Sequence, residues 1–192
     1  MIEEILKRLT YTYYPHNKCA TENYLEYVKT EEFIRLTTLI EYYQNSSITK
    51  KFKDDLLIEF GKYDFLNDVK DVTVFSWLDR CLSFEISIFD NNNLIRICLN
   101  LSLLAPFYLL YVLKNEICYE PYKWLTIPIR DKGEEDIRHK ELQIISSIIE
   151  RLGYNKFPDS LINIVIPDVS FGEIQFGQFT FFNAFFLDEE KK

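Results

Sequence analysis

The feature that most constrains the fold is an alternating pattern of side chains between residues 82 and 103. From 82 to 88 and from 95 to 103, every second residue is large and apolar, and the residues between are polar or small. Successive side chains of a β-strand point to opposite faces, so the pattern predicts two strands with one apolar face. Asparagines at 91–93 suit the reversal, because asparagine tolerates positive φ. The segment predicts an antiparallel hairpin whose polar face looks towards water or a partner.

Helical patterns occupy the first sixty residues. Apolar residues at helical spacing predict a short amphipathic helix over 2–9. A longer helix is expected after Thr30, which is a good N-cap residue, and it breaks at 45–47. Apolar residues at i, i+4 spacing then continue to Gly61, where a glycine that ends a helix is expected.

Two more strands are expected after the hairpin. Residues 107–113 are apolar on both sides, so this strand is expected to be covered by helices. Residues 122–129 form a weaker strand, which Pro121 and Pro128 favour for the edge of the sheet because proline cannot donate to a neighbouring strand. A clear amphipathic helix over 134–152 follows.

In two segments the predicted structure depends on the aromatic residues. Residues 72–77 are interpreted as a strand or as a loop that packs Trp77. Five phenylalanines between 179 and 186 leave both faces apolar, so this segment is expected to be a central strand that returns at the C-terminal end of the sequence.

The order of these elements predicts an α+β fold, because helices come in one block and strands in the next. We expect one domain over 1–192, with a helical section at 1–62 and a sheet-rich section at 70–187. The sheet is expected to be antiparallel with about four to six strands, with one long helix near 134–152 and a returning C-terminal strand. A doubly wound α/β fold is disfavoured, because it needs helices between successive strands.

Charge and composition exclude several function classes. The formal net charge is −8, from 30 acidic and 22 basic residues. Nucleic-acid binding is therefore not expected, whereas a basic protein partner is favoured. The most apolar window, 94–113, is interrupted by Arg96 and Pro106, so no membrane span is expected. Four dispersed cysteines without a C-x-x-C pair indicate reduced thiols and a cytoplasmic protein.

The sequence shows no motif for catalysis, nucleotide binding or metal binding. The two histidines, His16 and His139, are expected to be surface residues. Cys19 and His16 supply only two of the three or four ligands that zinc needs, so neither a metal nor a cofactor is expected. Cys98, on the polar face of the hairpin, is the one thiol expected to be exposed.

Tyrosines and acidic residues are the best candidates for an interaction surface. Seven of the 13 tyrosines fall in the first 43 residues, and tyrosine is favoured at protein interfaces. The alternative is that these rings line the junction between helices and sheet. The candidate surface residues are Tyr11, Tyr13, Tyr14, Glu85, Asp168 and Glu173.

Four segments, at 84–88, 101–108, 166–170 and 179–186, resemble small bacterial immunity-type proteins that are encoded beside secreted polymorphic toxins. The resemblance covers about the C-terminal hundred residues and carries no catalytic motif. It implies a cytosolic, non-enzymatic protein that binds and blocks a toxin domain, for which a basic toxin is the candidate partner.

Two alternatives stay open at the level of sequence. In the first, the chain is an enzyme of unknown reaction whose carboxylates and tyrosines meet only in the fold, for example around Glu85 and Asp168. In the second, the tyrosine-rich N-terminal region forms a homodimer. A deep pocket with shifted carboxylate pKa values would favour the enzyme.

Overall fold

The predicted hairpin is present in the computed structural model, which describes residues 1–90, 93–120, 123–129 and 139–188. It consists of β2 (Cys81–Asp90) and β3 (Asn93–Ser102), which pair antiparallel. The register places Phe84 opposite Leu99 and Ile86 opposite Ile97. Two of the three asparagines predicted for the turn, at 91–92, lie outside the described residues. The alternating pattern therefore predicted both the strands and their pairing.

The hairpin lies at the centre of the sheet, and the α+β prediction is confirmed. The strand order is β1-β2-β3-β4-β5, all antiparallel, and a two-residue strand, β6, adds a parallel pairing with β4. Strand β5 is at the edge of the sheet, as its prolines predicted. The bounds of the remaining strands are β1 (Val69–Asp71), β4 (Phe107–Glu120), β5 (Lys123–Ile129) and β6 (Asn155–Lys156).

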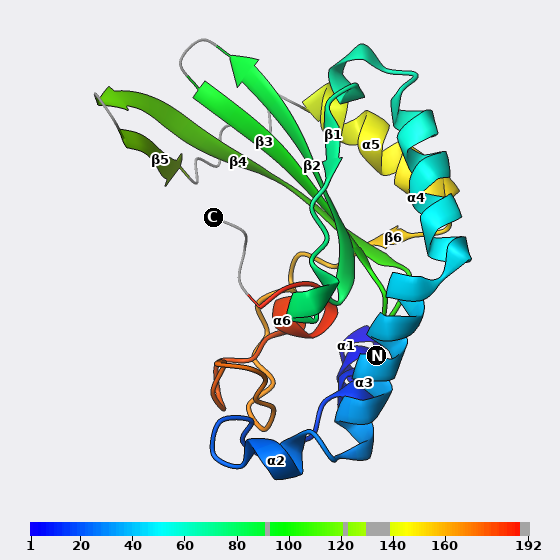
Figure 1. The fold of residues 1–192 in the computed structure, drawn as a ribbon, viewed down its shortest axis with the longest axis vertical. Helices are drawn as coiled ribbons and strands as arrows, with labels where there is room; N and C mark the ends of the chain where they lie inside the picture. The colour runs from blue at the N-terminus through cyan, green and yellow to red at the C-terminus, as the bar shows by residue number, and fades with distance from the viewer. Residues whose placement is uncertain (91–92, 121–122, 130–138, 189–192) are drawn as a thin grey trace.

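Helices lie along one side of the sheet, and further helices, together with loops of the C-terminal third, form the other half of the molecule (Figure 1). Their bounds are α1 (Ile2–Tyr13), α2 (Tyr24–Tyr27), α3 (Glu31–Asn45), α4 (Ser47–Phe60), α5 (His139–Arg151) and α6 (Phe181–Phe185), with short 3₁₀ helices η1 (Asp64–Leu66) and η2 (Phe75–Trp77). Thr30 caps α3 as predicted, because its hydroxyl accepts the Phe33 N–H at 3.4 Å. Helix α4 ends at Phe60, and Gly61 is its C-cap residue. The first residues of the helix predicted at 134–152 lie outside the described residues.

The apolar face of the hairpin packs against α4 and α5. Ile86, Ile97 and Leu99 have no exposed surface. They belong to a sheet cluster made of Leu56, Phe60, Leu66, Leu82, Phe84, Ile86, Ile97, Leu99, Leu101, Leu103, Tyr108, Ile145, Ile148 and Ile149. The predicted face of the hairpin is therefore the one on the core.

The polar face of the hairpin is less open to water than predicted. Ser83, Asn100 and Ser102 are buried, and so is Cys98, which was expected to be exposed. Among the polar side chains of this face whose burial the structure describes, Glu85, Ser87 and Arg96 keep partial exposure. Residues 109–112 of β4 are also half-exposed, so the prediction that helices cover this strand on both sides was wrong.

The C-terminal aromatic segment is a helix, and the prediction of a central strand there was wrong. Helix α6 is held by a capping box in which Thr180 and Asn183 exchange side-chain and backbone hydrogen bonds. Every residue from 181 to 187 is buried. A wholly buried helix needs no polar side, so the hydrophobic pattern alone could not show its period.

A second core, the phenylalanine cluster, surrounds α6 in the half of the molecule below the sheet in Figure 1. It joins α1 and α3 to the C-terminal third of the chain. Its buried residues are Leu6, Tyr14, Leu36, Ile40, Cys81, Leu104, Phe157, Leu161, Ile166, Val169, Phe171, Phe179, Phe181, Phe182, Ala184, Phe185, Phe186 and Leu187. Within the described part of the chain, no helix is long and apolar enough to cross a membrane.

Candidate functional site

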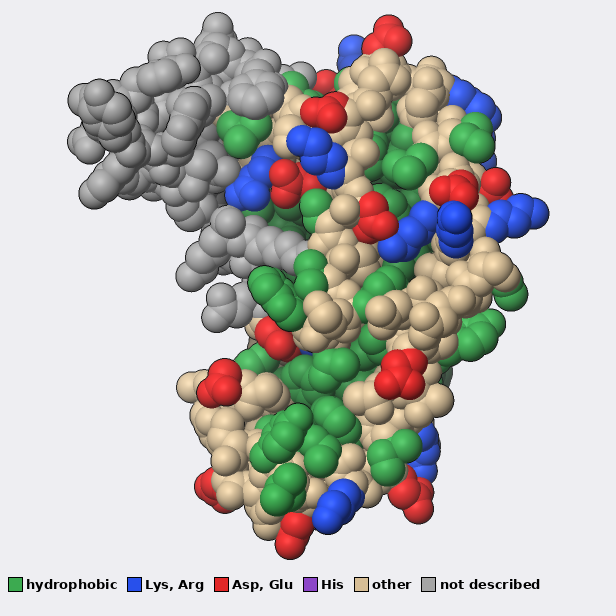
Figure 2. All heavy atoms as spheres, in the orientation of Figure 1, with side chains coloured by type: hydrophobic (Ala, Val, Ile, Leu, Met, Phe, Trp, Pro, Cys, Tyr) green, Lys and Arg blue, Asp and Glu red, His purple; other side chains and the backbone are tan. Residues whose placement is uncertain are grey.

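A cavity of about 510 Å³ opens on the surface of the phenylalanine cluster, where four distant parts of the chain meet. We call it the aromatic groove. Its lining residues are Ala20, Thr21, Tyr24, Tyr27, Phe33, Trp77, Leu78, Phe171, Gly172, Glu173 and Asp188. Figure 2 shows a patch of apolar side chains in the lower half of the molecule, over the region where Figure 1 places α2 and α6.

The floor of the groove is made of packed aromatic rings. The Tyr27 hydroxyl donates a 2.7 Å hydrogen bond to the Ser170 carbonyl, which fixes this buried ring against the C-terminal part of the chain. Phe33 packs edge-on against Tyr27, with 5.5 Å between ring centroids, and Phe171 closes the far side. Aromatic side chains bury a large area each, so these contacts contribute strongly to the stability of the floor.

The rim of the groove carries two exposed aromatic residues. Tyr24 is 62% exposed and Trp77 is 72% exposed. Residues 72–77 were predicted to be a strand or a loop that packs Trp77. They form a loop and η2, and the predicted packing of Trp77 was wrong because its side chain is exposed. Trp77 ends η2, and the next residue, Leu78, has a φ of 58° in the left-handed region. A leucine seldom adopts this conformation, which costs on the order of 1–3 kcal/mol and must be held by its surroundings.

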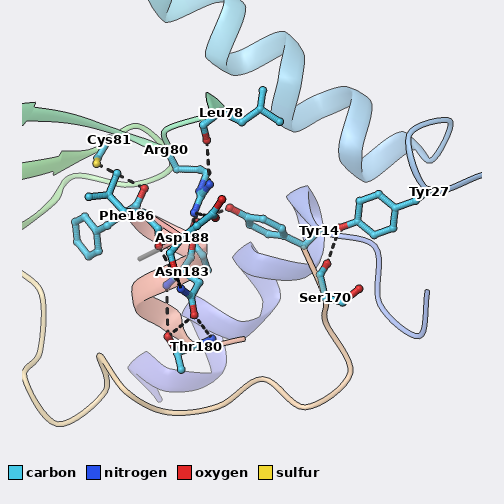
Figure 3. Close-up of polar contacts among 12 residues, drawn as sticks. Tyr14, Tyr27, Leu78, Arg80, Cys81, Ser170, Thr180, Asn183, Phe186 and Asp188 are labelled. Carbon is cyan, nitrogen blue, oxygen red and sulfur yellow. Dashed lines mark hydrogen bonds and ion pairs between the residues drawn. The ribbon is translucent and has the colours of Figure 1, made fainter. Parts of the chain in front are cut away.

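Arg80 supplies the hold on this turn. It is completely buried, and its Nη1 donates to the Leu78 carbonyl at 3.0 Å. Its Nε and Nη2 donate to the Asn183 carbonyl at 3.2 and 2.8 Å, and Nη2 also donates to Asp188 Oδ1 at 2.6 Å. Figure 3 shows the guanidinium between the Leu78 turn and α6. One side chain thus fastens η2 to the C-terminal helix.

The 16–22 stretch is fastened to the 168–175 stretch in a similar way. The Ala20 N–H donates to Ser170 Oγ at 2.7 Å, and Gln175 Nε2 donates to Thr21 Oγ1 at 3.2 Å. The Cys19 thiol lies 3.3 Å from Thr21 Oγ1, and this contact lowers the pKa of Cys19. These bonds hold the α2 side of the groove against the loop that contains Gly172 and Glu173.

The groove is electrostatically negative. Glu173 is exposed and has no hydrogen bond or ion pair with any described residue. Asp188 is shared with Arg80 through Oδ1, and its side chain remains 43% exposed. Among the lining residues, all of which the structure describes, there is no lysine or arginine. With Arg80 and Asp188 compensating each other, the groove keeps one uncompensated negative charge.

Comparison with known proteins found no matching family model, no similar curated protein and no similar solved structure. A function for this chain must therefore be inferred from the geometry of the groove.

The structure brings two of the predicted surface residues together. The Tyr11 hydroxyl lies 2.8 and 2.9 Å from the two carboxylate oxygens of Asp168. Partial burial and this hydrogen bond to Asp168 raise the pKa of Tyr11 to about 12. The His16 ring lies 5.1 Å from the Tyr11 ring, and Tyr13 nearby is half-buried. These residues do not line the groove. Asp168 is separated from the lining residue Phe171 only by Val169 and Ser170.

The other predicted residues lie in different places. Glu173 lines the groove. Tyr14 has no exposed surface, and its hydroxyl donates to the Ala184 carbonyl at 2.7 Å, so it cannot belong to an interaction surface. Glu85 lies on the sheet, where it accepts from Arg96 at 3.4 Å and from Ser87 at 3.3 Å. Glu85 therefore lies among Arg96 and Ser87 on the sheet, whereas Asp168 accepts from Tyr11, so the two carboxylates named for the enzyme alternative have different surroundings.

Sequence reasoning missed Tyr24, Trp77 and Asp188 as lining residues. From the sequence, Tyr24 is only one of seven tyrosines in the first 43 residues, Trp77 lies in a strand or loop, and Asp188 has no assigned role. In the described residues, no group of three or more His, Cys, Asp or Glu side chains could hold a metal ion. His139 is hydrogen-bonded to Gln143 at 2.7 Å, and this is not the arrangement of a catalytic base with a nucleophile.

Proposed function

We propose that this protein is a non-enzymatic binding module that engages a protein partner through the aromatic groove. The observation that carries the proposal is Trp77, a large aromatic side chain that is 72% exposed beside a cavity of about 510 Å³. Tryptophan and tyrosine dominate the energetic centres of protein interfaces, and isolated monomers gain nothing from exposing them together.

The local backbone supports the same proposal. The left-handed conformation of Leu78 opposes folding, and a buried Arg80 is needed to hold it. Strain of this kind is concentrated at binding and catalytic sites, where it sets the direction of a side chain. Here it keeps Trp77 at the rim, outside the phenylalanine cluster.

The charge of the chain indicates the kind of partner. A formal net charge of −8 and a negative groove favour association with a basic protein, because complementary charge accelerates encounter. The resemblance to immunity-type proteins leads to the same expectation. We therefore propose that the partner is a basic toxin domain, which this protein neutralises by direct binding in the cytoplasm.

The proposal is tested by co-expressing the full chain with the product of the adjacent gene and measuring the affinity of the purified pair. Trp77→Ala is expected to weaken the complex by about 30-fold, the effect of losing one interface hot spot. Tyr24→Ala is expected to weaken it in the same direction. Both residues are exposed, so circular dichroism should show an unchanged fold.

Tyr42→Ala is the matched control, because Tyr42 is 56% exposed on α3 and does not line the groove. It is expected to bind as tightly as the wild type. A complex that tolerates Trp77→Ala and Tyr24→Ala as well as it tolerates Tyr42→Ala would contradict the proposal.

A further inference from the structure

We infer that the aromatic groove receives a cationic side chain of the partner, and that this side chain is an arginine. The inference rests on the proposed function, because it names what the partner inserts. It is carried by the charge balance of the groove, by the aromatic rim and by the second carboxylate oxygen of Asp188.

The charge balance of the groove favours one added positive group. Arg80 and Asp188 compensate each other at 2.6 Å, and Glu173 has no positive partner among the described residues. The charges of Arg80, Asp188 and Glu173 sum to −1, so one monovalent cation would make the groove neutral. A carboxylate or a phosphate of the partner would instead be repelled by Glu173 and Asp188.

The rim offers the surfaces that a guanidinium prefers. Trp77 and Tyr24 expose much of their rings beside the cavity. A cation over an aromatic face is attracted by the ring, most strongly by tryptophan, and the planar guanidinium also stacks on it. Lysine would gain the charge interaction without the stacking, so arginine fits better.

The fold already binds one guanidinium with the same chemistry. The Arg80 guanidinium carbon lies 4.9 Å from the centre of the Phe171 ring, and its Nη2 bonds to Asp188 Oδ1. Figure 3 shows the guanidinium beside Asp188. Phe171 and Asp188 also line the groove, so the groove presents an aromatic and acidic wall from its open side.

The second oxygen of Asp188 lies beside Gly172, and the Asp188 side chain is 43% exposed. Oδ2 has no hydrogen bond with any described residue, and it lies 3.8 Å from where a Cβ of residue 172 would stand. Gly172 has a φ of 55°, a conformation that suits glycine. A Cβ at this position would be in ordinary van der Waals contact with Oδ2, and with glycine that side of the oxygen carries no neighbouring side chain from residue 172.

The experiment titrates the ¹⁵N-labelled full chain with N-acetyl-L-arginine N-methylamide and follows the backbone amide of Gly172 and the indole N–H of Trp77 by NMR. The comparison probe is the citrulline analogue, which has nearly the same shape but no charge. We expect saturable shifts with arginine and about tenfold weaker binding of citrulline. Added salt should weaken the arginine interaction.

Three substitutions assign the effect to the groove. Glu173→Gln is expected to weaken arginine binding by up to about fivefold and to leave citrulline binding unchanged. Trp77→Leu, followed through the Gly172 amide, is expected to weaken it by about two- to fivefold. Glu41→Gln is the control, because Glu41 is an exposed carboxylate on α3 outside the groove, and it should change nothing.

Several outcomes would overturn the inference. These are equal binding of the two probes, no shift at Gly172 and Trp77 with arginine, and shifts that appear on concentrating the protein alone, which would place a second copy in the groove. If Trp77→Ala abolishes the partner complex while arginine does not bind, the proposed function stands and the cation is wrong. If arginine binds but Trp77→Ala does not change the affinity of the partner complex, the cation site stands and the proposed function fails.

Discussion

Arg80 joins three parts of the candidate site, because its guanidinium bonds to the Leu78 turn, α6 and Asp188. Its burial could not be predicted from the sequence, since arginine is mostly exposed and the segment before β2 has no clear period. The residues around it illustrate the same limit. Trp77 and Tyr24 form the rim of the groove only because the fold leaves them uncovered.

Replacing Arg80 by methionine should destabilise the protein strongly. The substitution leaves the Asn183 and Leu78 carbonyls and the Asp188 carboxylate without their donor, and we expect a loss of about 3–5 kcal/mol in the free energy of unfolding. Urea denaturation followed by circular dichroism measures it.

Arg8→Met is the control for this prediction. The Arg8 side chain is 78% exposed and pairs with Glu4 at 3.1 Å on the surface of α1. Its loss should change the free energy of unfolding by less than about 0.5 kcal/mol. Equal effects of the two substitutions would show that Arg80 does not hold the site together.

At the scale of secondary structure elements, the local pattern was sufficient where one side of an element is wet. The hairpin, α1, α3 and α4 followed from period and capping residues, and the edge position of β5 followed from its prolines. The pattern failed for α6, which is buried all round. Its phenylalanines favoured a strand by propensity, yet Thr180 and Asn183 form a capping box, the one local signal that could have identified the helix.

Asn183 should therefore be critical for this element. Its Oδ1 accepts from the Thr180 N–H at 2.9 Å, and its Nδ2 donates to the carbonyls of Leu187 and Asp188 at 3.2 and 2.7 Å. We expect Asn183→Ala to lower the free energy of unfolding by about 2–3 kcal/mol, measured by urea denaturation.

The control for α6 is Asn163→Ala, because Asn163 is exposed and lies before the helix. It should be neutral within about 0.5 kcal/mol. A neutral Asn183→Ala would mean that packing of the phenylalanine cluster alone determines the helix.

At the scale of the whole molecule, the α+β class was predictable and the division of the core was not. The sequence predicted one domain over 1–192, whereas side chains pack into two clusters, with Phe75 in contact with both. Such a division depends on which distant segments meet, and hydrophobic period does not contain that information. The groove could not be predicted from the sequence for the same reason, because its walls come from four separate stretches of the chain.

The single-domain prediction requires the two clusters to unfold together. Leu99→Ala and Phe185→Ala each remove a side chain without exposed surface, one from the sheet cluster and one from the phenylalanine cluster. Each is expected to cost about 2–5 kcal/mol and to shift one common transition in urea. For each variant, the urea midpoint measured by circular dichroism should then equal the midpoint measured by tryptophan fluorescence. Separate midpoints would indicate two independently folding units.

Because the groove exists only in the folded protein, binding of a ligand there should raise the thermal stability of the protein. The groove is lined by residues that are far apart in the sequence, among them Tyr24, Trp77, Gly172 and Asp188. These residues are not close together in the unfolded chain, so a ligand of the groove binds only the folded protein. Mass action then draws the chain towards its native form, by about 2.7 kcal/mol at a ligand concentration of 100 times the dissociation constant. Melting curves would thus report engagement of the groove without any label.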